Sequence, residues 1–406
     1  MQPITLVKDA AKCSACGACI AVCPKQAITM ACDAYGAQYP VIDETLCVAC
    51  GKCINACMFH KPMEKCAQVA AYAAAGKNEA LIYKSASGGV FASLADSFRH
   101  SGGLVAGAVM DLQNSKAEVY HILSNEASDL FRMQGSKYVH SQAWKCYADV
   151  LQALKDGKTV LFSGLPCQVA AIKRLARNAD RLFTMDLVCH GAPPLQLFND
   201  FLPIIAKRFG GKIQQFAFRD KSCGKDYCAR IELGRGGKGH RLYLRAPYLS
   251  YYQYFLDCTI FRESCYACPF ASVERVSDLT IGDYWGVRQF HDEDIKSGSI
   301  PQRKEWSCIL VNSQKGEDFL AQYGNDLLLY PTKVDWITQN NRQLRNPSQK
   351  SLYREEFLKQ YAEFGYSAIE KDFIKKSGGR LRYYRRVVRD LWKNRQTNSI
   401  SKELEK

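Results

Sequence analysis

The sequence predicts a protein of mixed α+β and α/β class, with a small cysteine-rich N-terminal domain, a central mixed-sheet α/β domain and a basic helical tail. Three observations support this prediction. Two cysteine runs of one spacing lie before residue 60, strand and helix patterns alternate after residue 80, and basic residues outnumber acidic ones eleven to four over 372–406. We expect domain boundaries at 1–66, 80–345 and 350–406, with the alanine-rich stretch 67–80 as a connector.

Composition limits the classes of protein that the chain can represent. Its 406 residues suffice for two or three domains, and 47% hydrophobic with 23% charged residues is typical of a soluble protein. No run of 18 apolar residues is present, and the N-terminal residues lack the apolar core of a signal peptide, so we expect a cytoplasmic protein. The formal net charge is +15, but no recognition-helix motif or zinc-finger spacing accompanies it, so we expect no nucleic-acid partner.

The 19 cysteines favour metal ligation over disulfides, because no signal peptide accompanies them. Residues 13–24 read CSACGACIAVCP and residues 47–58 read CVACGKCINACM, and each contains the C-x2-C-x2-C-x3-C run of bacterial two-cluster ferredoxins. In that arrangement the fourth cysteine of each run binds the other cluster. We therefore predict a bacterial-type ferredoxin domain with two [4Fe–4S] clusters. The first cluster would be held by Cys13, Cys16, Cys19 and Cys57, and the second by Cys47, Cys50, Cys53 and Cys23.

Other residues of the two runs fit the loops that a cluster requires. Gly17 and Gly51 allow a tight turn without a Cβ clash, and Pro24 turns the chain after the first run. The second run has Met58 in place of that proline, which changes a turn and leaves the ligand set complete. A structural zinc module is the alternative, although zinc sites usually space their ligands as two separated pairs.

The central region alternates strand and helix patterns, which predicts a parallel or mixed sheet covered by helices. A serine and glycine loop, SASGGVF, opens the first of the helices. We expect helices over about 89–99 and from about Pro166, and strands over about 104–110, 158–163 and 182–188.

Four further cysteines fall where this topology brings strand ends together. Cys167 follows one strand at the start of a helix, and Cys189 ends the next strand. Strand, helix and strand in one unit give parallel, neighbouring strands, so both cysteines emerge at the carboxyl edge of the sheet, where open α/β sheets bind ligands. Cys265 and Cys268, in SCYACPF, complete a four-cysteine set, and we predict a third [4Fe–4S] cluster there. Zinc is the main competitor, and Cys167 or Cys189 taken alone also fits a buried apolar role.

Several motifs stand in an order that resembles a known family. The segments SASGGVF, GSKYVHS, GLPCQVAAIKR, DLVCHGAPP, FRDK, SCYACPFA and SDLTIGDYWGV resemble the coenzyme F420 hydrogenase/dehydrogenase beta-subunit family. The cysteine array ahead of them is similar to the ferredoxin domain fused to many members. The resemblance covers about 9–60 and 80–345, and the residues after about 350 lie outside it.

The resemblance implies an FAD beside the central cluster, with hydride exchange between the flavin and coenzyme F420 and single electrons passed to the clusters. It places the family's cluster ligands on the four central cysteines. From the residues alone, a Ser/Gly loop that opens a helix offers free N–H groups to a pyrophosphate. The candidate flavin contacts are Ser85, Ser87, Gly88, Gly89, Gly135, Ser136, Lys137 and Tyr138, with Asp283 and Trp285 as walls of the pocket.

The candidate catalytic residues are His190 and Lys137. His190 could donate a hydrogen bond to a cluster sulfur or to the flavin, and Lys137 could neutralise a phosphate or stabilise a reduced, anionic flavin. Arg219 and Lys221 of FRDK are candidates for binding the acidic tail of a substrate. The alternatives are a loop histidine with ordinary partners, solvated charges for the basic residues, a helix cap for Ser87 and a packing role for Trp285.

The tail predicts a basic amphipathic helix. Over 373–395, arginines alternate with apolar residues at roughly helical spacing, namely Leu381, Tyr384, Val388, Leu391 and Trp392. Such a helix can lie on anionic lipid, dock on an acidic partner, or remain a solvated terminal helix. The first reading would place the protein peripherally at the inner face of the membrane.

Together these features predict an iron–sulfur flavoenzyme that works with a redox partner protein or a small-molecule hydride donor or acceptor. Members of the family occur in bacteria that are not expected to use coenzyme F420, often in settings linked to surface-polysaccharide assembly. An electron-transfer subunit or reductase of polysaccharide biosynthesis, without coenzyme F420, is therefore the alternative. A zinc-stabilised scaffold is the third hypothesis.

Overall fold

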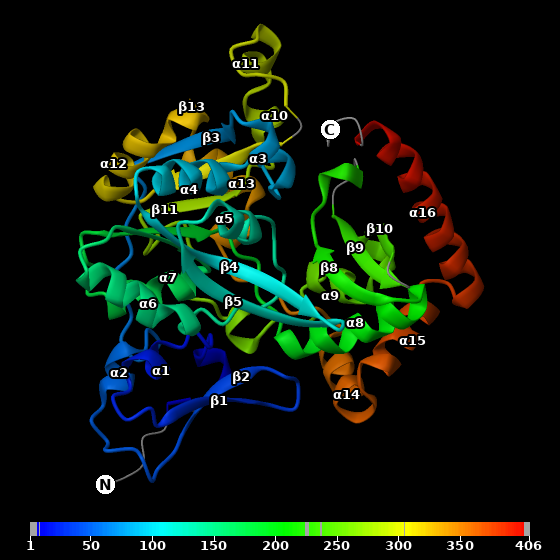
Figure 1. The fold of residues 1–406 in the computed structure, drawn as a ribbon, viewed down its shortest axis with the longest axis horizontal. Coiled ribbons are helices and arrows are strands. Elements are labelled where there is room, and N and C mark those ends of the chain that lie inside the picture. Colours follow the sequence, from blue (N-terminus) through cyan, green and yellow to red (C-terminus); the bar gives the residue numbers. More distant parts are fainter. Residues whose placement is uncertain (1–5, 8, 224–226, 236–237, 304, 402–406) are drawn as a thin grey trace.

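The computed structural model describes residues 6–7, 9–223, 227–235, 238–303 and 305–401, and it confirms the predicted fold class. A ferredoxin-like N-terminal region lies below a central α/β body in the view of Figure 1, and the C-terminal helices lie along the right-hand side beside a second, smaller sheet.

The N-terminal region consists of short elements around the cysteine runs. Strands β1 and β2 form an antiparallel hairpin in which Ile28 pairs with Ile42. A small apolar cluster of Leu6 and Ile28 packs against Cys19 and Cys53. The elements are η1 (Ala10–Lys12), α1 (Ala18–Val22), β1 (Ile28–Cys32), β2 (Gln38–Ile42) and α2 (Lys52–Ala56).

The central sheet has eight strands in the order β13-β3-β12-β11-β7-β6-β4-β5. The inner strands β11, β7, β6 and β4 run parallel, and the flanking strands pair antiparallel, as a mixed sheet requires. Their bounds are β3 (Ala70–Gly76), β4 (Leu104–Gln113), β5 (Lys116–Ser124), β6 (Val160–Gly164), β7 (Leu182–Leu187), β11 (Leu279–Asp283), β12 (Ser307–Val311) and β13 (Leu327–Pro331).

Helices cover both faces of this sheet. Phe98 of α4 contacts Phe319 of α12 on one face, with ring centroids 5.5 Å apart. Tyr147 of α6 and Ile172 of α7 belong to the apolar cluster on the other face. The helices of this region are α3 (Glu79–Lys84), α4 (Val90–His100), α5 (Ala127–Met133), α6 (Trp144–Lys155), α7 (Pro166–Leu175), α10 (Val287–Phe290), α11 (Asp292–Ser297), α12 (Gln314–Tyr323), η5 (Gly324–Asp326), α13 (Val334–Asn340) and η6 (Arg342–Leu344).

The alanine-rich stretch is part of this sheet, so the expectation of a connector over 67–80 is wrong for residues 70–76. These residues form β3, which pairs antiparallel with both β12 and β13. Ala73 and Ala74 are fully buried. Alanine is uncommon in strands, but its small side chain fits a strand that is covered on both faces, and this packing outweighs propensity.

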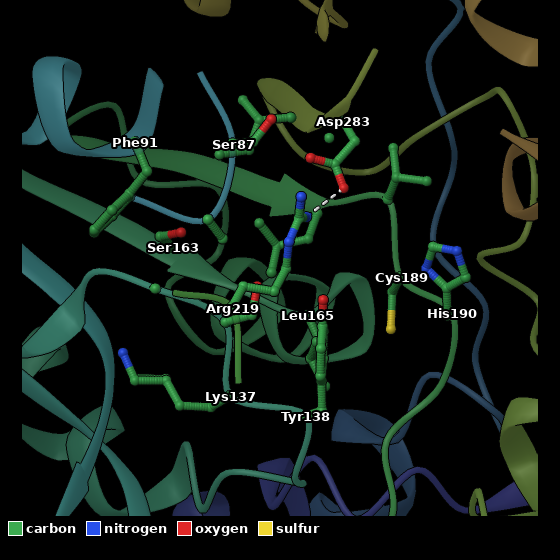
Figure 2. A pocket seen from close by; sticks show the side chains of 18 of the residues that line it. Ser87, Phe91, Lys137, Tyr138, Ser163, Leu165, Cys189, His190, Arg219 and Asp283 are labelled. Carbon is green, nitrogen blue, oxygen red and sulfur yellow. Dashed lines mark hydrogen bonds and ion pairs between the residues drawn. The ribbon is translucent and has the colours of Figure 1, made fainter. Parts of the chain in front are cut away.

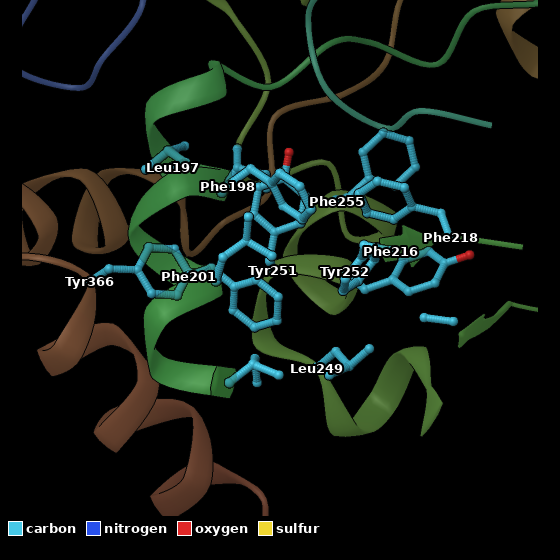
Figure 3. Close-up of a cluster of buried hydrophobic side chains, with 14 of the residues drawn as sticks. Leu197, Phe198, Phe201, Phe216, Phe218, Leu249, Tyr251, Tyr252, Phe255 and Tyr366 are labelled. Carbon is cyan, nitrogen blue, oxygen red and sulfur yellow. The ribbon is translucent and has the colours of Figure 1, made fainter. Parts of the chain in front are cut away.

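The second sheet is a three-stranded antiparallel meander beside the central body. Its aromatic core, in which Phe198 stands edge-on to Phe216, is shown in Figure 3. Phe201, Tyr251 and Tyr252 in the same core are fully buried. The elements are α8 (Leu195–Phe209), β8 (Lys212–Ala217), η2 (Lys221–Cys223), β9 (Cys228–Arg235), β10 (Lys238–Arg245), η3 (Ala246–Tyr248), α9 (Ser250–Leu256) and η4 (Glu263–Cys265).

The C-terminal part is helical as predicted, but the helix expected over 373–395 is divided in two. Helix α14 (Arg354–Phe364) is followed by α15 (Tyr366–Lys376) and α16 (Arg380–Ser401). Between the last two, Gly378 and Gly379 take φ values of +98° and +83°, which glycine adopts without the strain that other residues incur. None of the described helices is long and apolar enough to span a bilayer.

Candidate functional site

The first cysteine run gathers around the last cysteine of the second run. Burial is the main cause that raises the pKa of Cys16, to about 12, and repulsion from Cys13 and Cys57 adds to it. The pKa of Cys19 is raised by burial and by the same neighbours together with Cys16. Thiolates this crowded need compensating positive charge, which bound iron supplies. The spatial grouping is the crossed one that the spacing predicts.

The remaining cysteines of the two runs line a second small cavity. It is bounded by Cys23, Cys47, Cys50 and Cys53. The N–H group of Ala27 donates to the sulfur of Cys23 at 3.3 Å, and hydrogen bonds to ligand sulfurs tune the potential of iron–sulfur clusters.

The backbones of the two runs share one conformation. Ala15 and Gly17 in the first run have φ values of +49° and +79°, and Ala49 and Gly51 in the second have +51° and +70°. Left-handed residues placed this way turn successive N–H groups toward a common centre, a backbone arrangement that recurs at iron–sulfur sites. Each run therefore offers three sulfurs and a concave row of N–H groups to one anionic cluster, and its fourth cysteine to the other cluster.

The central set of four cysteines also surrounds one cavity. Cys167 lies in the first turn of α7, Cys189 follows β7, Cys265 ends η4, and Cys268 lies in the loop after it. All four line the same small cavity. Burial raises the pKa of Cys167 strongly, and repulsion from other thiolates, including these three partners, adds to it. The structure thus brings together the four cysteines that the topology places at one sheet edge.

Buried donors of the central body hold the first cysteine run in place. The ring Nε2 of His140 lies 3.1 Å from the carbonyl of Ser14, and the hydroxyl of Tyr147 donates to the carbonyl of Cys16 at 2.9 Å. The guanidinium of Arg262 donates to the carbonyl of Cys13 at 3.3 Å. No local sequence pattern marks these three residues, because they act through partners more than a hundred residues away.

The three cysteine sets form a series across the molecule. Among the charged neighbours that raise the pKa of Cys167, after burial, Cys16 comes first, so the first run lies beside the central set. Cys50 of the second run is exposed at the far end. The described residues contain no group of three or more His, Cys, Asp or Glu side chains placed to hold a single metal ion. An iron–sulfur cube binds its cysteines at separate corners, farther apart than the ligands of one ion.

A larger cavity of about 300 Å³ opens at the carboxyl edge of the parallel strands, a size typical of small-molecule sites. Figure 2 shows Arg219 extending across it toward Asp283, with Cys189 and His190 side by side at its edge. Residues 189–192 line both this cavity and the central cysteine cavity. The two sites therefore share one wall.

The predicted phosphate loop lies on this cavity, but part of it has other partners. Ser85, Ser87 and Gly89 line the cavity, and Gly88 does not. The N–H group of Gly88 donates to Ser307 Oγ at 3.0 Å, and a Cβ on Gly88 would lie 2.8 Å from the carbonyl of Ala74. The hydroxyl of Ser85 donates to the carbonyl of Leu81 at 2.8 Å. The free donors are instead the first N–H groups of α4, which no side chain caps.

Gly135, Ser136, Lys137 and Tyr138 all line the cavity. The ammonium group of Lys137 donates to three carbonyls at the end of α5, those of Arg132, Met133 and Gln134, at 2.8–2.9 Å. Burial, and then the charge of Arg132, lower the pKa of Lys137 to about 7. Lys137 is thus a helix cap that can change its charge near neutral pH.

Arg219 and Lys221 take different places. Arg219 lines the cavity, donates to Asp283 at 2.6 Å and lies over the rings of Tyr227 and Trp285. Lys221 does not line the cavity. It donates to the carbonyls of Ile82 and Ser87, both at 2.7 Å, and pairs with Glu305, so it fastens the phosphate loop from outside.

His190 and two residues that the sequence did not suggest complete the site. His190 lines both cavities, and burial lowers its pKa. His121 and Gln134 line the larger cavity, and His121 Nδ1 and Gln134 Oε1 are buried without a hydrogen-bond partner. Unpaired buried polar atoms are costly, so a ligand that pairs with them would be stabilised. With the uncapped N-terminus of α4 and an apolar lining, these atoms fit a ligand that has a polar ring system and phosphates, as FAD has.

Two cysteines form a disulfide, contrary to the expectation that the cysteines serve metal ligation. Cys223 and Cys228 are bonded, with their Cα atoms 6.3 Å apart, at either end of the turn between η2 and β9. Both are buried against Tyr243. The bond ties η2, which carries Lys221, to the start of β9 beside Tyr227.

The mixed-sheet fold, the two crossed cysteine sets and the central set define an iron–sulfur electron-transfer protein of the oxidoreductase class. Residues 157–333 match the family described as the C terminus of the coenzyme F420 hydrogenase/dehydrogenase beta subunit, and residues 12–61 match the 4Fe-4S dicluster domain. The chain therefore carries a domain that matches this beta-subunit family over residues 157–333, with a match to the dicluster ferredoxin domain ahead of it.

Comparison with solved structures finds 13 similar chains. A chain of the xenon-derivatised F420-reducing [NiFe] hydrogenase complex from Methanosarcina barkeri aligns with 76% of this chain and 94% of its own length, at 14% identity and a TM-score of 0.43. No curated protein matches the chain.

Proposed function

We propose that the chain is an iron–sulfur flavoprotein oxidoreductase that relays electrons between its ferredoxin-type clusters and an FAD, which exchanges a hydride with coenzyme F420 or another soluble substrate. The observation that carries the proposal is the wall formed by residues 189–192, which belongs to both the central cysteine cavity and the larger cavity. A two-electron carrier and a one-electron cluster exchange electrons where they lie close, and a shared wall supports such contact.

The residues around the larger cavity would bind and orient the flavin. FAD, when bound, would supply hydride transfer to a substrate and single-electron exchange with a cluster. The first N–H groups of α4 would hold its phosphates, and Tyr138, stacked on Phe255 with ring centroids 4.2 Å apart, forms a rigid apolar wall. His190, whose pKa burial lowers, lines both cavities and would donate a hydrogen bond to the flavin or to a cluster sulfur.

The mouth of the cavity would bind a planar, anionic substrate. Trp285 is 44% exposed, and its ring stacks on Tyr227 beside the guanidinium of Arg219. An aromatic face next to a fixed cation suits a flat heterocycle with an acidic tail, and the name of the matched family makes coenzyme F420 the nominal substrate. Lys221 would act indirectly, by holding the Ser87 loop.

Electrons would reach the outer end of the series through a redox partner protein. Cys50 is exposed, and Leu46 and Val48, which flank Cys47, are 49% and 52% exposed. An exposed cluster rim with apolar neighbours suits brief contact with an electron carrier.

The alternative is an electron-transfer subunit or reductase of bacterial surface-polysaccharide biosynthesis that does not use coenzyme F420. It is favoured by the chemistry of the cavity mouth, because Arg219 and Trp285 would accept many planar anions. We propose a cytoplasmic location for either function, with peripheral contact at the inner face of the membrane.

Metal and flavin analysis of the anaerobically purified chain tests the proposal. We expect about twelve irons and one FAD per chain, since each of three clusters holds four irons. Cys167→Ala should remove about four irons and leave the two ferredoxin clusters, whereas Cys308→Ala, which changes a buried cysteine of β12 outside the three sets, should remove none. Equal iron in the wild-type chain, Cys167→Ala and Cys308→Ala would contradict the central cluster, and the absence of flavin would contradict the flavoprotein. Both results together would leave a two-cluster electron carrier.

The substrate is tested by mixing the loaded protein with reduced coenzyme F420 under argon. Loss of the oxidised-flavin absorbance after mixing supports coenzyme F420 as the hydride donor. Arg219→Met should raise the apparent Kd for reduced coenzyme F420, so that more of it is needed to reduce the flavin. Flavin that stays oxidised, while dithionite still reduces it, would favour the alternative function.

A further inference from the structure

The two faces of α16 differ sharply in their surroundings. Tyr383 and Val387 are buried against the second sheet at 1% and 2% exposure. On the opposite face Leu381, Val388 and Trp392 are 81%, 63% and 61% exposed. Positions 381, 388 and 392 follow one another at helical spacing, so the three apolar side chains form one row along the outward face.

The outward face is also strongly cationic. Five arginines of α16 are exposed: Arg380, Arg382, Arg385, Arg386 and Arg389. Among the described residues, none of these five forms an ion pair. The acidic residue of this stretch, Asp390, is buried and accepts from Arg245 at 2.8 Å. The helix therefore turns its carboxylate inward and leaves an uncompensated positive charge outside.

This face is held rigidly at the edge of the molecule. The hydroxyl of Tyr383 donates to the carbonyl of Tyr248 at 2.7 Å and accepts from Arg208 at 2.9 Å. Figure 1 shows α16 as the outermost element of the C-terminal side, with β10 next to it on the side toward the centre of the molecule. The exposed row is thus a fixed feature of the surface, supported along its inner side.

We propose that the outward face of α16 binds the surface of a membrane that contains anionic phospholipids. Leu381, Val388 and Trp392 would enter the boundary between headgroups and acyl chains, and the arginines would contact lipid phosphates. Tryptophan favours this boundary, and arginine can bury its aliphatic stem while its charge stays at the headgroups.

Charge and shape distinguish lipid from an acidic protein as the occupant. The row lies on a convex helix, and its apolar side chains project separately over about 16 Å, taken from the helical rise between positions 381 and 392. Protein partners of an amphipathic helix receive it in a groove that encloses adjacent side chains. A fluid lipid surface accepts widely spaced side chains without such a groove. The proposal does not depend on the redox function.

Vesicle flotation of the full anaerobic chain tests the proposal. We expect the protein to float with phosphatidylcholine vesicles that contain about 30% phosphatidylglycerol and to stay behind with phosphatidylcholine alone. Arg385→Glu with Arg389→Glu should weaken partitioning at least about 25-fold, because each arginine near an anionic surface contributes about fivefold. Lys155→Glu with Lys158→Glu, an equal charge change at the exposed end of α6, should leave partitioning unchanged.

A second pair of substitutions separates lipid from simple charge attraction. Leu381→Ser with Trp392→Ser keeps every arginine and should still lower partitioning several-fold, and Trp392 fluorescence should shift to the blue when the wild-type chain binds vesicles. Equal binding to both vesicle types would overturn the proposal, as would equal loss in the α6 control. Tight binding to soluble polyglutamate that does not depend on Leu381 or Trp392 would overturn it in favour of an acidic partner.

Discussion

Replacing Gly17 with alanine should weaken the attachment of the first cysteine run, whereas the same change at Gly51 should have a smaller effect. The two glycines hold equivalent positions in the two runs and have φ values of +79° and +70°. Their surroundings differ. A Cβ on Gly17 would lie 2.3 Å from the Cβ of Trp144, while a Cβ on Gly51 would meet nothing within 4 Å.

The structure sets the size of the difference. Both substitutions place an alanine in the left-handed region, which costs about 1–2 kcal/mol. A carbon–carbon distance of 2.3 Å is far below the roughly 3.5–4.0 Å of ordinary contact, so Trp144 or the run must move. Forced overpacking of this kind costs about 1–3 kcal/mol. We therefore expect Gly17→Ala to be less stable than Gly51→Ala by about 1–3 kcal/mol.

Thermal loss of the visible iron–sulfur absorbance under argon, with limited proteolysis of the N-terminal region, measures this difference. Gly17→Ala should lose its absorbance at the lower temperature and be cleaved faster. Trp144→Gly removes the Cβ of Trp144 together with its ring, so Gly17→Ala should cost less in that background than in the wild-type chain. Identical behaviour of the two single alanine variants would refute the reasoning, because the backbone conformation alone would then account for the effect.

The remaining predictions concern buried polar contacts. Burial, and then the charge of Arg262, lower the pKa of His140 from 6.5 to about 3, so the unfolded chain takes up the proton first. His140 therefore makes its full contribution to the free energy of unfolding above pH 6.5. Below that pH the free energy of unfolding falls by about 1.4 kcal/mol per pH unit, and His140→Gln should flatten this slope in denaturant titrations. Tyr147→Phe removes the hydrogen bond to the carbonyl of Cys16 and should lower the free energy of unfolding by about 1–3 kcal/mol. The iron content should stay the same. Arg219→Met and Asp283→Asn should each lower the free energy of unfolding by about 3 kcal/mol, because each breaks the same ion pair. The double variant should lose less than the sum of the two single losses. Additive losses would show that the two residues do not interact.

Local spacing accounts for the parts of the site that the sequence predicts. The four sulfurs of a cluster are placed by short loops, so the spacing of the cysteine runs is enough to group Cys16 with Cys57 and Cys23 with Cys53. The central set needed topology as well, because Cys167 and Cys189 meet only if β6 and β7 are parallel neighbours, which they are. The phosphate loop was predicted from the family resemblance and from its place at the start of a helix, and Ser85, Ser87 and Gly89 line the cavity.

The features that the sequence did not predict depend on distant partners. Residues 70–76 become a strand because β12 and β13 bury them from both sides, and their alanines give no strand signal of their own. Lys221 lies outside the cavity because the carbonyls of Ile82 and Ser87 receive it, over a separation of more than 130 residues. The break at Gly378 was visible as a glycine pair, but the arginines and apolar residues that alternate after it favoured one continuous helix.

The order of the three cysteine sets also determines how the protein would fail in air. Cys50 is exposed at the surface, while Cys167 lines an internal cavity between the first run and the wall at residues 189–192. Molecular oxygen would therefore reach the outer iron first and the inner iron last. A preparation exposed briefly to air would keep its inner cluster and lose the outer one. Such a protein could hold most of its iron and still exchange no electrons with a partner.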